Sequence, residues 1–147
     1  MTKDEIIGYV SGLSGVLALQ PQPGDGTPEI AWGDAFFYYS PDGTVPGNVQ
    51  PFATIVTKDY PDDTLSRLDR PGVFRLNIDV SRDDFARLTS AETDPSAADV
   101  IFAHPVYGRL GWISVINPGE RTTDAARELL DAAYRTARSR YERRASR

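Results

Sequence analysis

Segments with strand propensity follow one another across short, turn-rich connections, and this order constrains the fold more than any other feature of the sequence. The turns include Pro41-Asp42-Gly43 and Arg70-Pro71-Gly72, and such residues favour tight reversals of the chain. Parallel neighbours need crossovers of a dozen or more residues, so short connections predict antiparallel pairing. The expected strands, rich in aromatic or β-branched residues, are 16–19, 34–40, 52–57, 73–79 and 111–116.

Helical signals flank this run of strands. Thr2 and Glu5 form a capping box before a first helix at 3–13. Ser81 with Asp84 predicts a helix at 82–89, and an apolar stripe predicts a long last helix from 122 to about 141. A further short helix is expected near 64–68.

These elements predict an α+β fold, in which a curved antiparallel sheet has its helices packed on one face. The chain has 147 residues and no cysteine, so one core must form without disulfides. We therefore expect a single domain spanning 1–147, with a C-terminal helix at about 122–141 and a frayed basic tail.

Charge is unevenly distributed along the chain. Residues 1–120 carry a net charge of −9, whereas the part from Arg121 onward has eight arginines and four acids. An acidic body argues against nucleic acid as a partner, because that affinity depends on neutralised phosphates. We expect the helix arginines to pair with nearby acids, among them Arg127, Arg135 and Arg138 with Glu128, Asp131 and Glu142. No apolar run suits a membrane and no basic start suits a signal peptide, so a cytoplasmic protein is expected.

Several motifs resemble known families. The segments Pro51–Pro61 and Ala103–Gly108 resemble an uncharacterised actinobacterial family of small proteins. The helix start at Asp4–Ile7, the segment Trp32–Tyr38 and the strand Gly111–Val115 resemble MmcQ/YjbR-like proteins.

The MmcQ/YjbR-like resemblance implies a CyaY-like α+β fold and a proposed role in DNA binding. In that family basic residues and a histidine precede the late tryptophan. Here Tyr107–Gly111 stand in their place and only Trp112 is retained. This departure weakens the DNA-binding expectation.

His104 is the only histidine, so any histidine-based acid–base or metal chemistry has to use it. It precedes Pro105 at a turn, where it could join Tyr107 and the Lys58–Asp59 pair or merely hydrogen-bond a loop. The carboxylates of Asp59, Asp62, Asp63 and Asp69 lack the spacing of a calcium loop, and a solvated turn is expected instead. No glycine-rich loop fits a nucleotide, so neither a metal nor a cofactor is expected.

Aromatic pairs give the remaining signal. Consecutive strand residues point to opposite faces, so Phe36-Phe37 and Tyr38-Tyr39 each place one ring away from the helix-covered core. Rings on that face, with Arg75 and Asn77 from the alternating strand 73–79, suit a small planar molecule. Packing in the core, a protein interface or a homodimer seam are the other interpretations.

These observations favour a non-enzymatic binding domain for a small planar or aromatic molecule, or for a protein partner. Two alternatives stay open: a DNA-associated protein that uses the arginine-rich helix, and a small enzyme that uses His104 with Asp59 or Tyr107. The expected ligand-binding residues are Trp32, Tyr38, Lys58, Arg75, His104, Tyr107 and Trp112.

Overall fold

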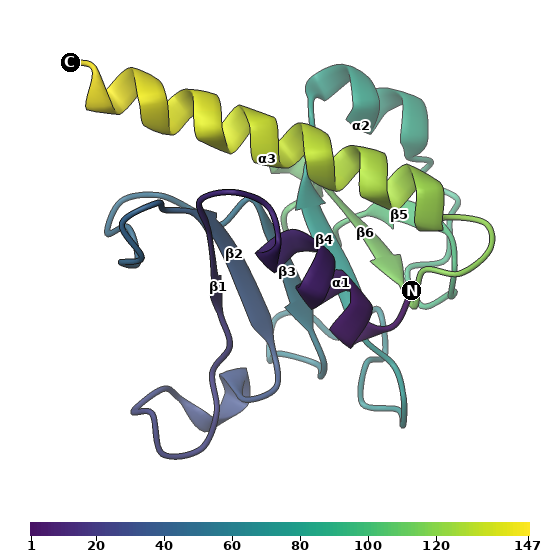
Figure 1. Ribbon diagram of the computed structural model, residues 1–147. Helices are drawn as coiled ribbons and strands as arrows, with labels where there is room; N and C mark the ends of the chain where they lie inside the picture. The colour runs from purple at the N-terminus through teal and green to yellow at the C-terminus, as the bar shows by residue number, and fades with distance from the viewer.

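A six-stranded antiparallel sheet, open at both edges, organises the protein (Figure 1). The computed structural model describes residues 1–147, and every paired strand is antiparallel, in the order β1-β2-β3-β4-β6-β5. The elements are α1 (Lys3–Ser11), β1 (Val16–Leu19), η1 (Glu29–Ala31), β2 (Ala35–Tyr39), β3 (Ala53–Val56), β4 (Arg75–Asp79), α2 (Arg82–Leu88), β5 (Ile101–Ala103), η2 (Gly108–Leu110), β6 (Trp112–Ile116) and α3 (Thr123–Ala145). The predicted α+β class with a curved antiparallel sheet is confirmed.

Helices α1 and α3 cover one face of the sheet (Figure 1). Alternation along the strands decides which residues they cover, because neighbouring side chains point to opposite faces. In β4, Leu76 and Ile78 join the main core, whereas Arg75 and Asn77 face the other way. The helices contribute mainly Ile6, Val10, Ala126, Leu129, Leu130, Ala133 and Tyr134. This packing leaves the opposite face of the sheet for a site.

Part of that opposite face is covered by the connection between β3 and β4. Leu68 from this connection is 1% exposed and packs with Phe102 and Ile116 in a second, smaller cluster. The helix predicted near 64–68 is wrong, since the segment forms turns with Arg67 in the left-handed region at φ 54°. The Asp59 carboxylate accepts the backbone N–H of Leu68 and holds the turn in place (2.8 Å).

The ends of two helices and one additional strand differ from the sequence prediction. Helix α1 ends at Ser11, and Gly12 is its C-cap. The short strand β5 was not predicted, and it pairs with β6 through Ile101, Phe102 and Ala103. Helix α3 continues to Ala145, so the tail expected to fray is largely helical. None of the helices combines the length and the apolar character that a membrane span requires.

Of the ion pairs expected along α3, only Arg138 with Glu142 forms, at 2.8 Å. Arg127 instead lies over the ring of Tyr9, and Asp131 accepts the hydroxyl of that tyrosine. These contacts join α3 to α1.

Candidate functional site

A cavity of about 690 Å³ lies on the face of the sheet opposite the helices, and we call it the sheet-face cavity. Strands β2, β3, β4 and β6 contribute to it, as do the connections that follow β3 and β5. Its lining consists of Pro28, Ile30, Ala31, Phe36, Tyr38, Gln50, Pro51, Thr54, Val56, Tyr60, Asp62, Asp63, Arg75, Asn77, His104, Val106, Tyr107, Leu110 and Trp112.

Polar side chains from adjacent strands meet at the floor of this cavity. The strand register pairs Asn77 in β4 with Thr54 in β3 and with Ser114 in β6. Asn77 donates to the Thr54 hydroxyl (3.0 Å) and accepts from the Ser114 hydroxyl (2.7 Å) and from Nε of Arg75 (2.8 Å). Because cross-strand partners lie directly opposite one another, the register itself builds this network.

Arg75 is fully buried and is neutralised by a residue from a loop. Its two terminal nitrogens bind the two carboxylate oxygens of Asp63, at 3.0 and 2.5 Å, and Nη1 also donates to the Ser66 hydroxyl. Burial opposes ionisation of Asp63, but the hydrogen bonds and charge of Arg75 hold its pKa below the usual range. The two-point geometry is the strongest form of carboxylate pairing available to an arginine.

His104 lies against this ion pair and is only 6% exposed. Its Nδ1 accepts the backbone N–H groups of Val106 and Tyr107, at 3.1 and 3.0 Å, while its Nε2 lies 3.2 Å from Nη2 of Arg75. Burial and the adjacent guanidinium lower the pKa of His104 to about 4, and Asp63 offsets part of the effect. The imidazole is therefore neutral at neutral pH.

Aromatic and aliphatic side chains form the walls and the rim. Phe36 and Tyr38 line the cavity, whereas Phe37 belongs to the main core and Tyr39 packs edge-on against Tyr134. The predicted division of these rings between the two faces is therefore confirmed. Of the five large apolar side chains exposed on the protein surface, three line this cavity: Ile30, Tyr107 and Leu110.

Five of the seven predicted site residues line this one cavity: Tyr38, Arg75, His104, Tyr107 and Trp112. Trp32 and Lys58 do not line it and take part in an adjoining cluster around Asp34, which shares Tyr60 with the cavity lining. The Lys58 ammonium binds the Asp34 carboxylate and the Trp32 carbonyl, both at 2.8 Å. The buried Asp34 also accepts from Thr57 and from the Tyr60 hydroxyl, whose pKa is raised by burial and by this carboxylate.

The sequence did not single out Asp63 as part of the site. Its loop was expected to be a solvated turn, yet the Asp63 side chain is 11% exposed and pairs with Arg75. The signal was the unusual placement of Arg75 in a strand with apolar neighbours, since a buried guanidinium requires a carboxylate. No three His, Asp or Glu side chains lie together as a metal site.

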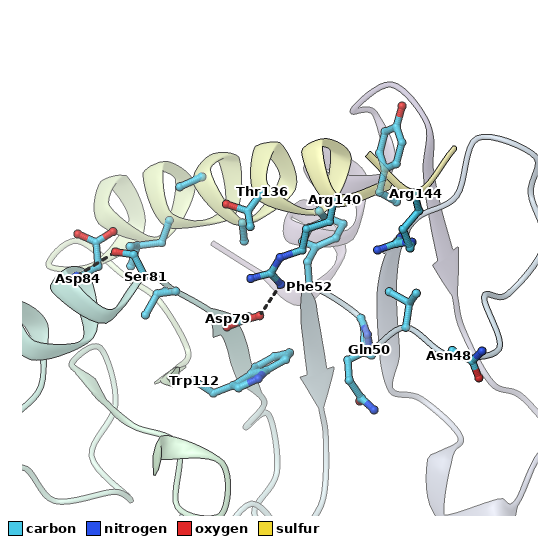
Figure 2. A pocket seen from close by; sticks show the side chains of 18 residues that line it. Asn48, Gln50, Phe52, Asp79, Ser81, Asp84, Trp112, Thr136, Arg140 and Arg144 are labelled. Atoms are coloured by element: carbon cyan, nitrogen blue, oxygen red, sulfur yellow. Dashed lines mark hydrogen bonds and ion pairs between the residues drawn. The ribbon is translucent and has the colours of Figure 1, made fainter. Parts of the chain in front are cut away.

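A second cavity, of about 510 Å³, lies between α3 and the ends of β3 and β4 (Figure 2). Arg140 reaches toward Asp79 there, with the closest atoms 3.9 Å apart, and Trp112 lines both cavities. The Arg140 side chain is 57% exposed and that of Asp79 is 35% exposed, so solvent screens this pair. The sheet-face cavity, with its buried polar floor, is the stronger candidate site.

Fold and cavity together define an α+β domain with a pocket on the free face of an open antiparallel sheet. The chain belongs to a family of unknown function, DUF6194, whose model matches residues 1–146. No curated protein and no solved structure matches it. The similarity to MmcQ/YjbR-like proteins stays a prediction, as does an actinobacterial origin of the relatives.

Proposed function

We propose that this protein binds a small planar molecule in the sheet-face cavity and is not an enzyme. The observation that carries the proposal is the convergence of a buried polar floor, Arg75, Asn77 and His104, with aromatic walls in one cavity. Cavities for small ligands typically measure roughly 300–1,000 Å³ and combine apolar walls with a few placed polar groups. The volume of about 690 Å³ falls within this range.

The state of the titratable groups favours binding over proton transfer. Nδ1 of His104 is occupied by two backbone N–H groups, and Asp63 is held by Arg75. A general base needs a free lone pair within reach of the substrate proton. The two buried candidates, Nδ1 of His104 and the carboxylate of Asp63, are thus engaged within the protein, and the remaining acid of the lining, Asp62, is exposed.

Tryptophan fluorescence tests the proposal directly, because the chain has only two tryptophans. In a Trp32→Phe background, Trp112 is the sole reporter, and because it lines both cavities, the variants below assign the signal to one of them. We expect members of a library of planar aromatic molecules to change its emission saturably.

A matched pair of variants localises the binding. Tyr38→Ala removes a wall of the cavity, whereas Tyr141→Ala removes a ring that packs against Tyr39 on the helix side. The first should weaken binding at least several-fold and the second should leave it unchanged. Silence across the library, or equal effects of the two variants, would overturn the proposal.

A protein partner is the second candidate, and the exposed rim favours it. Tyr107 and Leu110 are 48% and 67% exposed beside Ile30, and clustered apolar side chains often mark interfaces. If two copies pair through this rim as a homodimer, Leu110→Arg should abolish the dimer in light-scattering measurements. A wild-type protein that is monomeric at all concentrations would exclude the homodimer.

A further inference from the structure

The second cavity, of about 510 Å³, holds charged side chains of both signs, and we call it the helix-side cavity. Asp79, at the end of β4, lines it from the sheet, whereas Arg140 and Arg144 reach it from α3 (Figure 2). The two arginines are four residues apart and therefore lie on the same face of the helix. A ligand in this cavity would meet two cations on the helix and a carboxylate on the sheet.

The carboxylate of Asp79 has no cation within hydrogen-bond distance. Its only ion-pair partner is Arg140, and the closest atoms of the two side chains are 3.9 Å apart. Burial raises the pKa of Asp79 above its usual range, and the charge of Arg140 offsets only part of this effect. A cation that approached Asp79 more closely would therefore stabilise it.

The two arginines are available to a ligand for the same reason. Arg144 takes part in no ion pair, and Arg140 has only the distant contact with Asp79. The Arg140 side chain is 57% exposed, so it can turn without disturbing the core. The other acid of the lining, Asp84, is already paired with Arg87 at 2.8 Å. Asp79 is thus the acid that lacks a close partner.

These charges favour a ligand that carries a cation and an anion together. An anion alone would draw Arg140 away from Asp79 and leave a half-buried carboxylate without a cation. A cation alone would leave both arginines without an anion. In an α-amino acid a single carbon atom joins the ammonium to the carboxylate, so the two groups can reach neighbouring partners of opposite charge.

Apolar side chains lie beside the charged ones in the helix-side cavity. Phe52 and Leu129 belong to the main core, and Tyr39 and Trp112 also line the cavity. Alanines of α3 face them across the space between helix and sheet. Burial of an apolar group against these residues would add to the affinity.

We infer that the helix-side cavity binds a free α-amino acid with a large apolar side chain, whose carboxylate pairs with Arg140 and Arg144 and whose ammonium pairs with Asp79. The apolar side chain packs against Phe52 and Trp112. The inference does not depend on the proposed function, which concerns the opposite face of the sheet.

Four probes test this preference on the full chain. L-phenylalanine carries both charges and a ring, 3-phenylpropanoate lacks the ammonium, phenethylamine lacks the carboxylate, and glycine lacks the ring. A charge-assisted hydrogen bond is worth about ten-fold in affinity. In calorimetric titrations we expect L-phenylalanine to bind about ten-fold more tightly than each of the other three.

Three outcomes of these titrations would overturn the inference. If 3-phenylpropanoate binds as tightly as L-phenylalanine, the cavity takes a simple anion, and if phenethylamine does so, it takes a simple cation. If L-phenylalanine does not bind, the cavity is not an amino-acid site. The proposed function would stand in all three cases, because planar molecules in the sheet-face cavity test it separately.

Variants connect each charge of the ligand to its partner. Asp79→Asn should remove the advantage of L-phenylalanine over 3-phenylpropanoate, and Arg140→Gln should reduce its advantage over phenethylamine. The control is Arg138→Gln, since Arg138 lies on the same helix but pairs with Glu142 outside the cavity. Equal effects of the two arginine variants would contradict the inference. Thermal melts establish that each variant folds, and the comparison of probes on the wild-type chain holds even where one does not.

Tyr38→Ala separates the two cavities, because Tyr38 lines only the sheet-face cavity. This variant should leave the affinity for L-phenylalanine unchanged and weaken the binding of planar molecules. Loss of L-phenylalanine binding in Tyr38→Ala, with no loss in Arg140→Gln, would place the amino acid in the sheet-face cavity. That result would overturn the inference and leave the proposed function standing.

Discussion

Both carboxylate oxygens of Asp63 accept hydrogen bonds from Arg75. Arg75 lies in the central strand β4, and Asp63 lies in the loop that precedes this strand. The Arg75 side chain is 1% exposed and that of Asp63 is 11% exposed. The salt bridge therefore fixes the loop to the sheet and forms one side of the cavity floor.

Asp63→Asn should destabilise the protein by about 3 kcal/mol, because it leaves a buried guanidinium without a countercharge. The control is Asp62→Asn, one residue earlier, since Asp62 is exposed and forms no ion pair. Its effect should stay within about 0.5 kcal/mol. Urea denaturation of both variants gives the free energies of unfolding, and similar values would refute the structural role of the salt bridge.

Acid should destabilise the fold through His104. In the unfolded chain its pKa returns to 6.5, whereas in the folded protein it is about 4, so between these values the unfolded state binds more protons. The stabilising contribution is complete above pH 6.5 and is lost as the pH falls toward 4, by up to about 3 kcal/mol. The depressed pKa of Asp63 adds a further loss at lower pH.

The measurement is the free energy of unfolding at several pH values from 7 to 4.5, for wild type and for His104→Gln. The variant should lose most of the slope between pH 6.5 and 5, where carboxylates contribute little. An imidazole that titrates near 6.5 in the folded protein would contradict the expectation.

Lys58→Ala should lower stability and leave ligand affinity unchanged. Its ammonium holds Asp34 and the Trp32 carbonyl, outside the cavity. Removal leaves the buried Asp34 carboxylate without its cation but with three hydrogen-bond donors, two from Thr57 and one from Tyr60. A cost of about 1–2 kcal/mol is expected, measured by denaturation beside a fluorescence titration. A loss of ligand affinity without a loss of stability would instead support the prediction that Lys58 is a ligand-binding residue.

The arginines near the end of α3 should not make the chain a DNA-binding protein. Residues 1–120 carry −9, which repels phosphates, and Arg138 is paired with Glu142. Fluorescence anisotropy with a labelled duplex should show no binding at physiological salt. Binding that falls steeply with salt, and is lost when Arg143, Arg144 and Arg147 are replaced by Gln, would support the DNA-associated alternative.

The strands of the sheet could be predicted from the sequence because alternation and turn residues are local signals. Arg75 and Asn77 were placed correctly on one face by the period of the strand alone. The strand β5 escaped prediction because it is three residues long and lies beside a small, polar loop. Its stability comes from pairing with β6, which no local pattern reveals.

The site could be predicted only in part, for a similar reason. The predicted residues that line the cavity have aromatic, cationic or imidazole side chains, which are candidates for ligand binding in any sequence: Tyr38, Arg75, His104, Tyr107 and Trp112. Asp63 is part of the site because it pairs with Arg75, twelve positions further along the chain. The helix expected beside it is replaced by turns, and these place Leu68 in the smaller hydrophobic cluster. Neither contact has a local signature.

The floor of the cavity is also part of the interior of the protein, and this limits which of its residues can be replaced. Arg75, Asn77 and His104 are each 6% exposed or less and bind one another, so any change to one of them disturbs the others and the fold. Ile30, Tyr107 and Leu110 have exposed side chains, so substitutions there should disturb the fold less. If the cavity binds a ligand as proposed, substitutions that change its specificity are therefore expected at the rim rather than at the floor.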